Sequence, residues 1–187
     1  YAIADLGLIA CPGAEELCKL VDSHLVRWAR EVGNTDVDTF IIPSDCPRFQ
    51  SGDAKGLVKA STRGDDLYIF VDPGNYSVTY QLFGYENHLS PDDHFQNLMR
   101  LIQAVSGRAH RISVIMPSLY GGRQHRRVSR ESLDCAFALQ QLRDVGVKNI
   151  ITFDAHDPRV MNAVPTMSFD NVMPTYQVLK CLLHHVP

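Results

Sequence analysis

Ile112-Ser-Val-Ile-Met116 and Asn149-Ile-Ile-Thr-Phe153 are two apolar runs with the length of a buried strand. Between them, residues 132–145 have the sequence of a helix, and Gly146 is a residue type that often ends one. A helix that connects two buried strands is typical of a right-handed crossover between parallel strands. This stretch therefore predicts an α/β fold.

The rest of the chain continues the alternation of strands and helices. Apolar runs predict further strands at 6–11, 38–42, 67–71 and 166–169. Periodic apolar positions predict helices at 17–32, 90–106 and 174–185. Together these elements predict a mostly parallel sheet flanked by helices on both faces. Residues 72–89 exceed a usual connection and form either a functional loop or a small hairpin.

Composition sets broad limits on the class of protein. The 187 residues are 45% hydrophobic, which predicts one sizeable core, and 18 basic against 21 acidic residues give a formal charge of −3. This balance gives no reason to expect nucleic acid or an anionic membrane as a partner. The sequence shows no signal peptide and no apolar run long enough to span a bilayer. Five widely spaced cysteines favour a reducing cytoplasm over a disulfide framework.

Residues 108–130 contain six arginines and no acid until Glu131. Arginine presents a planar fork of donors that matches phosphate oxygens and can stack on a purine. Gly121 and Gly122 precede Arg123, so the backbone can approach a ligand closely. The pattern indicates a polyphosphate or nucleotide loop. A solvated basic loop paired with nearby acids, or a nucleic-acid patch, remains as an alternative.

A second polar loop, Asp154-Ala-His156-Asp157-Pro158, follows the strand at 149–153. Asp154 and His156 are suited to Mg²⁺, held directly or through water. Alternatively, Asp157 caps a short helix and Asp154 anchors the backbone of the loop. Both polar loops follow strands of one parallel sheet, and ligands bind at that edge.

These motifs resemble those of the ribose-phosphate pyrophosphokinase family, whose members make phosphoribosyl pyrophosphate (PRPP). Residues 111–127 resemble its strand ending in Pro, followed by Tyr/Gly and Arg-Gln-Asp-Arg-Lys. Residues 146–156 look like its Val-Asp-Leu-His segment, and 169–171 like its Val-Asp-Asn. Residues 48–53 are similar to its Phe-Ser-Asp-Gly-Glu loop. The resemblance covers nearly the whole chain in the right order.

The resemblance implies a phosphoribosyltransferase-like half of an enzyme that transfers the diphosphoryl group of Mg-ATP to ribose 5-phosphate. It further implies a homo-oligomer in the cytoplasm, with no nucleic acid and no membrane as partner. The residues that it assigns to ATP are Arg123, Gln124, Arg126, Phe49 and Asp53, of which the last two complete the adenine pocket of a neighbouring subunit. The residues that it assigns to the metal side are Asp154 and His156.

The chain departs from the family pattern at several positions. His125 stands where the family has Asp. In the 48–53 loop the first acid of the family pattern is absent and the second is shortened to Asp53. The adjacent acids Asp65-Asp66 and Asp92-Asp93 lack the Thr/Gly-rich loop that binds ribose phosphate in the family. We therefore expect residues 1–187 to be a single N-terminal, ATP-contacting domain without the ribose-5-phosphate domain, and to make no PRPP alone. A non-catalytic regulatory module and an RNA-binding module are the alternatives.

Overall fold

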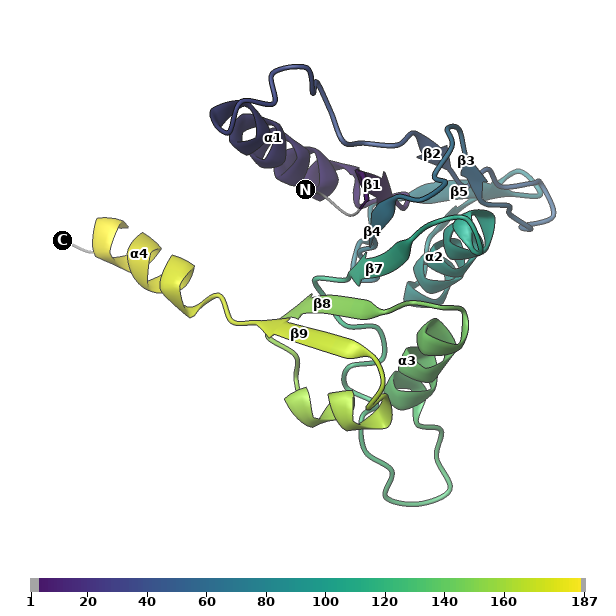
Figure 1. The fold of residues 1–187 in the computed structure, drawn as a ribbon. Coiled ribbons are helices and arrows are strands. Elements are labelled where there is room, and N and C mark those ends of the chain that lie inside the picture. Colours follow the sequence, from purple (N-terminus) through teal and green to yellow (C-terminus); the bar gives the residue numbers. More distant parts are fainter. Residues whose placement is uncertain (1–3, 186–187) are drawn as a thin grey trace.

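The computed structural model describes residues 4–185 and contains a five-stranded, fully parallel sheet (Figure 1). Across the sheet the strands follow their order in the sequence: β1 (Leu6–Ala10), β4 (Asp66–Phe70), β7 (Arg111–Ile115), β8 (Asn149–Phe153) and β9 (Ser168–Val172). The α/β fold and the parallel sheet are thus confirmed. All the carboxyl ends of the strands lie at one edge, which is where the two polar loops begin.

Helices cover both faces of the sheet, as predicted. Alternate residues of β4 separate the two layers, because successive side chains of a strand point to opposite faces. Phe70 belongs to the core cluster under α1 (Glu15–Glu31), together with Leu8 and Cys18. Leu67 and Ile69 belong to the cluster under α2 (Pro91–Val105) and α3 (Asp134–Asp144).

The start of α2 is fixed by its sequence. The Ser90 side chain accepts from the backbone N–H of Asp93, and the Asp93 carboxylate accepts from the backbone N–H of Ser90. Pro91 occupies the first helical turn, where its missing N–H costs nothing. This reciprocal capping box fixes the first turn of α2.

The strand predicted at 38–42 is wrong as a full strand. Ile41 forms an isolated parallel bridge with Leu8 of β1. The Leu8 N–H donates to the Phe40 carbonyl and the Ile42 N–H donates to the Leu8 carbonyl, so the segment pairs with the edge strand at one point only. The backbone N–H of Phe40 donates to the Asp22 carboxylate of α1, and the Thr39 hydroxyl donates to the same carboxylate. The Asp22 carboxylate thus accepts from the Phe40 N–H, which would otherwise be free to extend the pairing with β1.

Two small hairpins interrupt the crossovers. One pairs β2 (Ser44–Asp45) with β3 (Leu57–Val58), a pairing that no pattern in the sequence predicted. The other pairs β5 (Thr79–Leu82) with β6 (Tyr85–His88), which confirms the hairpin alternative for 72–89. Its two turn residues, Phe83 and Gly84, both have positive φ, the geometry of a tight hairpin turn.

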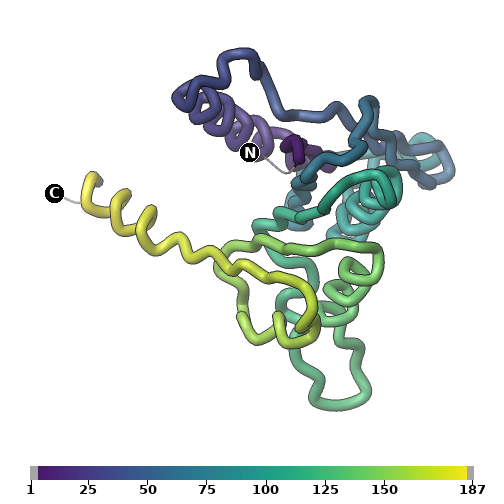
Figure 2. Tube along the Cα trace, in the orientation of Figure 1, coloured from purple at the N-terminus to yellow at the C-terminus, as the bar shows by residue number. Residues whose placement is uncertain are grey.

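The last described element is α4 (Thr175–His185), which extends away from the sheet (Figures 1 and 2). Its described side chains, 175–184, are all exposed. No helix within 4–185 is both long and apolar enough to cross a membrane. Four cysteines serve as small buried core residues, and burial raises the pKa of the Cys135 thiol to about 11.

Candidate functional site

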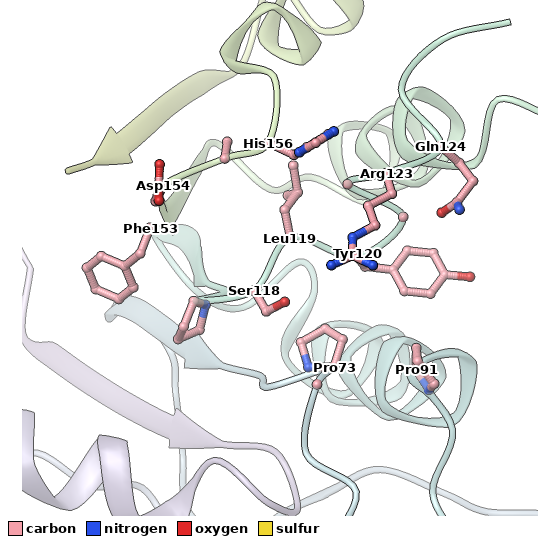
Figure 3. A pocket seen from close by; sticks show the side chains of 15 residues that line it. Pro73, Pro91, Ser118, Leu119, Tyr120, Arg123, Gln124, Phe153, Asp154 and His156 are labelled. Atoms are coloured by element: carbon pink, nitrogen blue, oxygen red, sulfur yellow. The ribbon is translucent and has the colours of Figure 1, made fainter. Parts of the chain in front are cut away.

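A cavity of about 570 Å³ opens at the carboxyl ends of β4, β7 and β8 (Figure 3). Residues 117–124 line it from the loop after β7, and residues 153–156 line it from the end of β8 and the loop that follows. Pro73-Gly74 after β4 and Pro91 of α2 complete the wall. The two polar loops of the sequence therefore share one cavity, at the sheet edge where they were expected.

A glycine turn presents Arg123 and Gln124 to this cavity. Gly121 has a φ of +65°, and an added Cβ would lie 3.0 Å from the backbone nitrogen of Cys135. The backbone N–H of Gln124 donates to the Gly121 carbonyl and closes the turn. Both predicted ATP residues are exposed, and their side chains hydrogen-bond to no residue within 4–185. Figure 3 shows the Arg123 side chain pointing back toward Pro73.

Tyr120 forms a rigid wall of the cavity. Its ring stacks on Phe95 of α2, with the ring centroids 4.6 Å apart. Its hydroxyl donates to Oδ1 of Asp92 over 2.6 Å. This hydrogen bond to a carboxylate raises the pKa of Tyr120 to about 12, so the phenol keeps its proton at neutral pH. The loop is thereby fastened to the first turn of α2.

The second loop brings Asp154 and His156 to the opposite side of the cavity. Asp154 has a φ of +45°, and its backbone N–H donates to the Val172 carbonyl of β9. The Asn171 side chain accepts from the backbone N–H of Ala155 and ties the loop to β9. The Asp154 carboxylate and the His156 ring are exposed and form no hydrogen bond with any residue of the described chain.

The donor set suits a metal that arrives with phosphates. Residues 4–185 contain no cluster of three or more His, Cys, Asp or Glu side chains that would hold a metal ion by themselves. Mg²⁺ in nucleotide sites takes one or two carboxylates from the protein, and water and phosphate oxygens fill its other positions. Asp154 can supply such a carboxylate, so the residues fit Mg²⁺ bound to a nucleotide.

Arg126 lies at a second cavity, of about 400 Å³, instead of beside Arg123. His125 lines the same cavity, with Nδ1 3.0 Å from the Gly122 carbonyl oxygen and Nε2 3.6 Å from Oδ2 of Asp157. Asp157 caps the 3-10 helix Pro158–Ala163 and binds the Arg159 guanidinium, which lowers the pKa of Asp157 well below its usual range. The cap expected of Asp157 is confirmed.

Phe49 and Asp53 line neither cavity. They belong to the segment between β2 and β3, where the Phe49 backbone N–H donates to the Asp53 carbonyl. The Phe49 ring is half exposed, at 50%. Their expected contribution to the adenine pocket of a neighbouring subunit stays a prediction.

Comparisons with known proteins agree on one family. The family described as the N-terminal domain of ribose phosphate pyrophosphokinase matches residues 6–146. Ribose-phosphate pyrophosphokinase 1 of Candida albicans is 26% identical over 144 residues, which are 76% of this chain and 41% of that protein. The crystal structure of phosphoribosylpyrophosphate synthetase from Mycobacterium smegmatis superposes with a TM-score of 0.73 at 19% identity, over 97% of this chain and 52% of the other. The chain thus spans about half the length of these relatives, or less.

Proposed function

The chain belongs to the family of N-terminal domains of ribose phosphate pyrophosphokinases, and we propose that it is the ATP-binding half of such an enzyme. The reaction proposed for the whole protein transfers the diphosphoryl group of Mg-ATP to ribose 5-phosphate and yields PRPP and AMP. Ribose 5-phosphate would be bound outside residues 1–187, because no pair of acids in them precedes a Thr/Gly-rich loop. In a homo-oligomer, each copy would contribute its Phe49 and Asp53 to the adenine pocket of a neighbouring copy.

This proposal rests on exposed polar side chains around one cavity that hydrogen-bond to no described residue. The side chains of Arg123 and Gln124 on one side, and of Asp154 and His156 on the other, form no hydrogen bond with residues 4–185 and are exposed to a ligand. The His156 ring also makes an edge contact with His125, with the ring centroids 5.1 Å apart. Arg123 is the one Arg or Lys in the described lining, so it would meet the phosphates or stack on the purine. A volume of about 570 Å³ lies within the range of small-molecule and cofactor sites.

Phosphoryl-group transfer depends mainly on positioning and on neutralising spread-out negative charge. Mg²⁺ supplies part of that neutralisation when it is bound with ATP, and Asp154 and His156 would hold it. Arg123 would add a fixed positive charge from the glycine turn. Tyr120 and Pro91 are held by α2 and would limit the positions open to the nucleotide.

Calorimetric titration of the chain with Mg-ATP tests the proposal. We expect a dissociation constant between micromolar and millimolar, weakened about tenfold or more by Arg123→Ala through loss of a charge-assisted contact. Arg127→Ala is the matched control, because Arg127 is an exposed arginine of the same loop that lies away from the cavity. Absence of binding by the wild type would contradict the proposal. Equal losses from both variants would indicate general attraction of anions by the basic loop.

A further inference from the structure

Arg48 joins three separate elements at the start of the loop between β2 and β3. Its Nη1 donates to the Gly52 carbonyl over 2.9 Å, and its Nη2 donates to Oδ1 of Asp93 over 3.0 Å. Its guanidinium also lies over the Tyr80 ring of β5, 4.5 Å from the ring centroid. The Arg48 side chain is only 12% exposed. It therefore ties its own loop to the capping box of α2 and to the β5–β6 hairpin.

The loop at 48–55 is closed on itself and covered by that hairpin. The backbone N–H of Gly52 donates to the Phe49 carbonyl, and Arg48 forms a bridge with Ala54. From the hairpin, the Phe83 backbone N–H donates to the Gln50 carbonyl over 3.0 Å. Close packing adds to this hydrogen bond, because a Cβ added to Gly52 would lie 2.9 Å from the Leu82 side chain.

Phe49 is left accessible while its backbone is fixed. Its carbonyl and N–H are both used within the loop, yet the residue is 50% exposed. The Lys55 ammonium lies 5.8 Å from the ring centroid. A ring presented on an ordered loop has already lost its conformational freedom before a ligand arrives, which favours binding. The capping-box carboxylate of Asp93 thus supports the Arg48 contact that orders the loop.

We propose that Arg48 is a positioning residue, which holds the 48–55 loop against α2 and the β5–β6 hairpin so that Phe49 is presented to the base of a nucleotide bound by a second copy of the chain. This inference rests on the proposed function. It assigns to residues 79–88 a role that the sequence left open, namely to cover and order the loop. Arg48 acts through Phe49 and does not itself touch the ligand.

Hydrogen exchange of the chain tests whether Arg48 holds the loop. In Arg48→Gln we expect the amides of Phe49 and Gly52 to exchange about tenfold faster or more, because a charge-assisted anchor is lost. Arg48→Lys should recover part of the protection, and exchange in β4 and β7 should stay unchanged and show that the sheet is intact. Arg63→Gln is the control, since Arg63 is exposed and its side chain has no partner within 4–185. Unchanged exchange of Phe49 and Gly52 in Arg48→Gln would overturn the proposal.

Mg-ATP titration of Arg48→Gln, Phe49→Ala and the double variant tests the link to the nucleotide. If Arg48 acts through Phe49, the double variant binds no more weakly than Phe49→Ala alone. Additive losses, or an affinity of Phe49→Ala equal to that of the wild type, would overturn the assignment. A wild type that binds no ATP would contradict the proposed function instead, and exchange alone would then decide whether Arg48 holds the loop.

Discussion

The hydroxyl of Tyr120 donates a 2.6 Å hydrogen bond to the carboxylate of Asp92, the residue before the Asp93 that binds Arg48. Two successive acids in the first turn of α2 therefore hold two different loops. One loop lines the cavity through Tyr120, and the other carries Phe49. Since the capping box fixes this turn, the positions of both loops depend on one short piece of helix.

Tyr120→Phe should lower the free energy of unfolding by about 1 kcal/mol, the usual worth of one hydrogen bond, because the stacking on Phe95 is kept. The pKa of Tyr120 is raised, so its bond contributes fully below the ordinary value of 10.0 and is lost as the pH rises toward about 12. Urea unfolding between pH 7 and pH 11 measures this difference. Tyr85→Phe, at a side chain that is 78% exposed, is the control and should change little. Equal effects of the two variants would contradict the role of Asp92.

Gly121→Ala should destabilise the chain more than Gly107→Ala. Both glycines have positive φ, at +65° and +74°, so each variant suffers backbone strain of about 1 kcal/mol. Only at Gly121 does the new Cβ also meet backbone, 3.0 Å from the nitrogen of Cys135, whereas nothing lies within 4 Å at Gly107. Thermal unfolding of the two variants measures the difference. Equal losses would mean that the close approach at Gly121 is relieved by a small shift.

The alternation of apolar runs predicted most of the fold, because parallel strands buried on both faces leave a continuous apolar signature. At 38–42 the run is apolar enough for a full strand, but its pairing with β1 is limited to the single bridge at Ile41. There the decisive contact comes from the Asp22 carboxylate, which accepts hydrogen bonds from the Phe40 N–H and the Thr39 hydroxyl. Asp22 lies seventeen residues before Thr39. Local patterning carries no information about such a partner.

The candidate site was predictable where it depends on topology alone. Arg123 and Asp154 follow neighbouring parallel strands, so their meeting at one cavity follows from the order of the sheet. The bond between Tyr120 and Asp92 joins residues 28 apart, and no spacing rule indicates it. Arg126 lies only three residues beyond Arg123, but the chain turns at Gly121 and Gln124 and takes Arg126 to the second cavity.

Asp93→Asn should destabilise the chain at neutral pH by about 1–2 kcal/mol, as expected for a weakened cap and a lost charge-assisted bond. Burial alone would raise the pKa of Asp93, but hydrogen bonds from Ser90 and Arg48 outweigh it, and the pKa lies below its ordinary value of 3.8. Because its pKa is depressed in the folded state, the Asp93 carboxylate stabilises the fold fully above pH 3.8. This stabilisation is lost as the pH falls further.

The difference in the free energy of unfolding between wild type and Asp93→Asn should therefore stay constant from pH 7 to about pH 4. It should shrink below that pH as the wild-type carboxylate takes up a proton. Urea unfolding at intervals between pH 7 and pH 2.5 measures it. Asp38→Asn is the control, since that carboxylate is 94% exposed and its ion pair with Arg30 contributes little. A gap that does not change with pH would show that Asp93 acts only as a cap and not through its charge.

Asp154→Asn distinguishes two roles of the Asp154 carboxylate, namely binding Mg²⁺ and simply repelling phosphate. If Asp154 holds Mg²⁺ with the nucleotide, the variant should bind ATP about tenfold more weakly in Mg²⁺, because a direct or water-mediated ionic contact is lost. With EDTA present the sign should reverse, since removing a negative charge from the cavity favours free ATP. Calorimetry under both conditions gives the two affinities. Asp170→Asn is the control, because Asp170 is an exposed carboxylate of β9 that does not line the cavity. Tighter binding by Asp154→Asn in Mg²⁺ as well as in EDTA would contradict a metal role and leave Asp154 as a purely repulsive charge, so that Arg123 would face the phosphates without a metal held by this carboxylate.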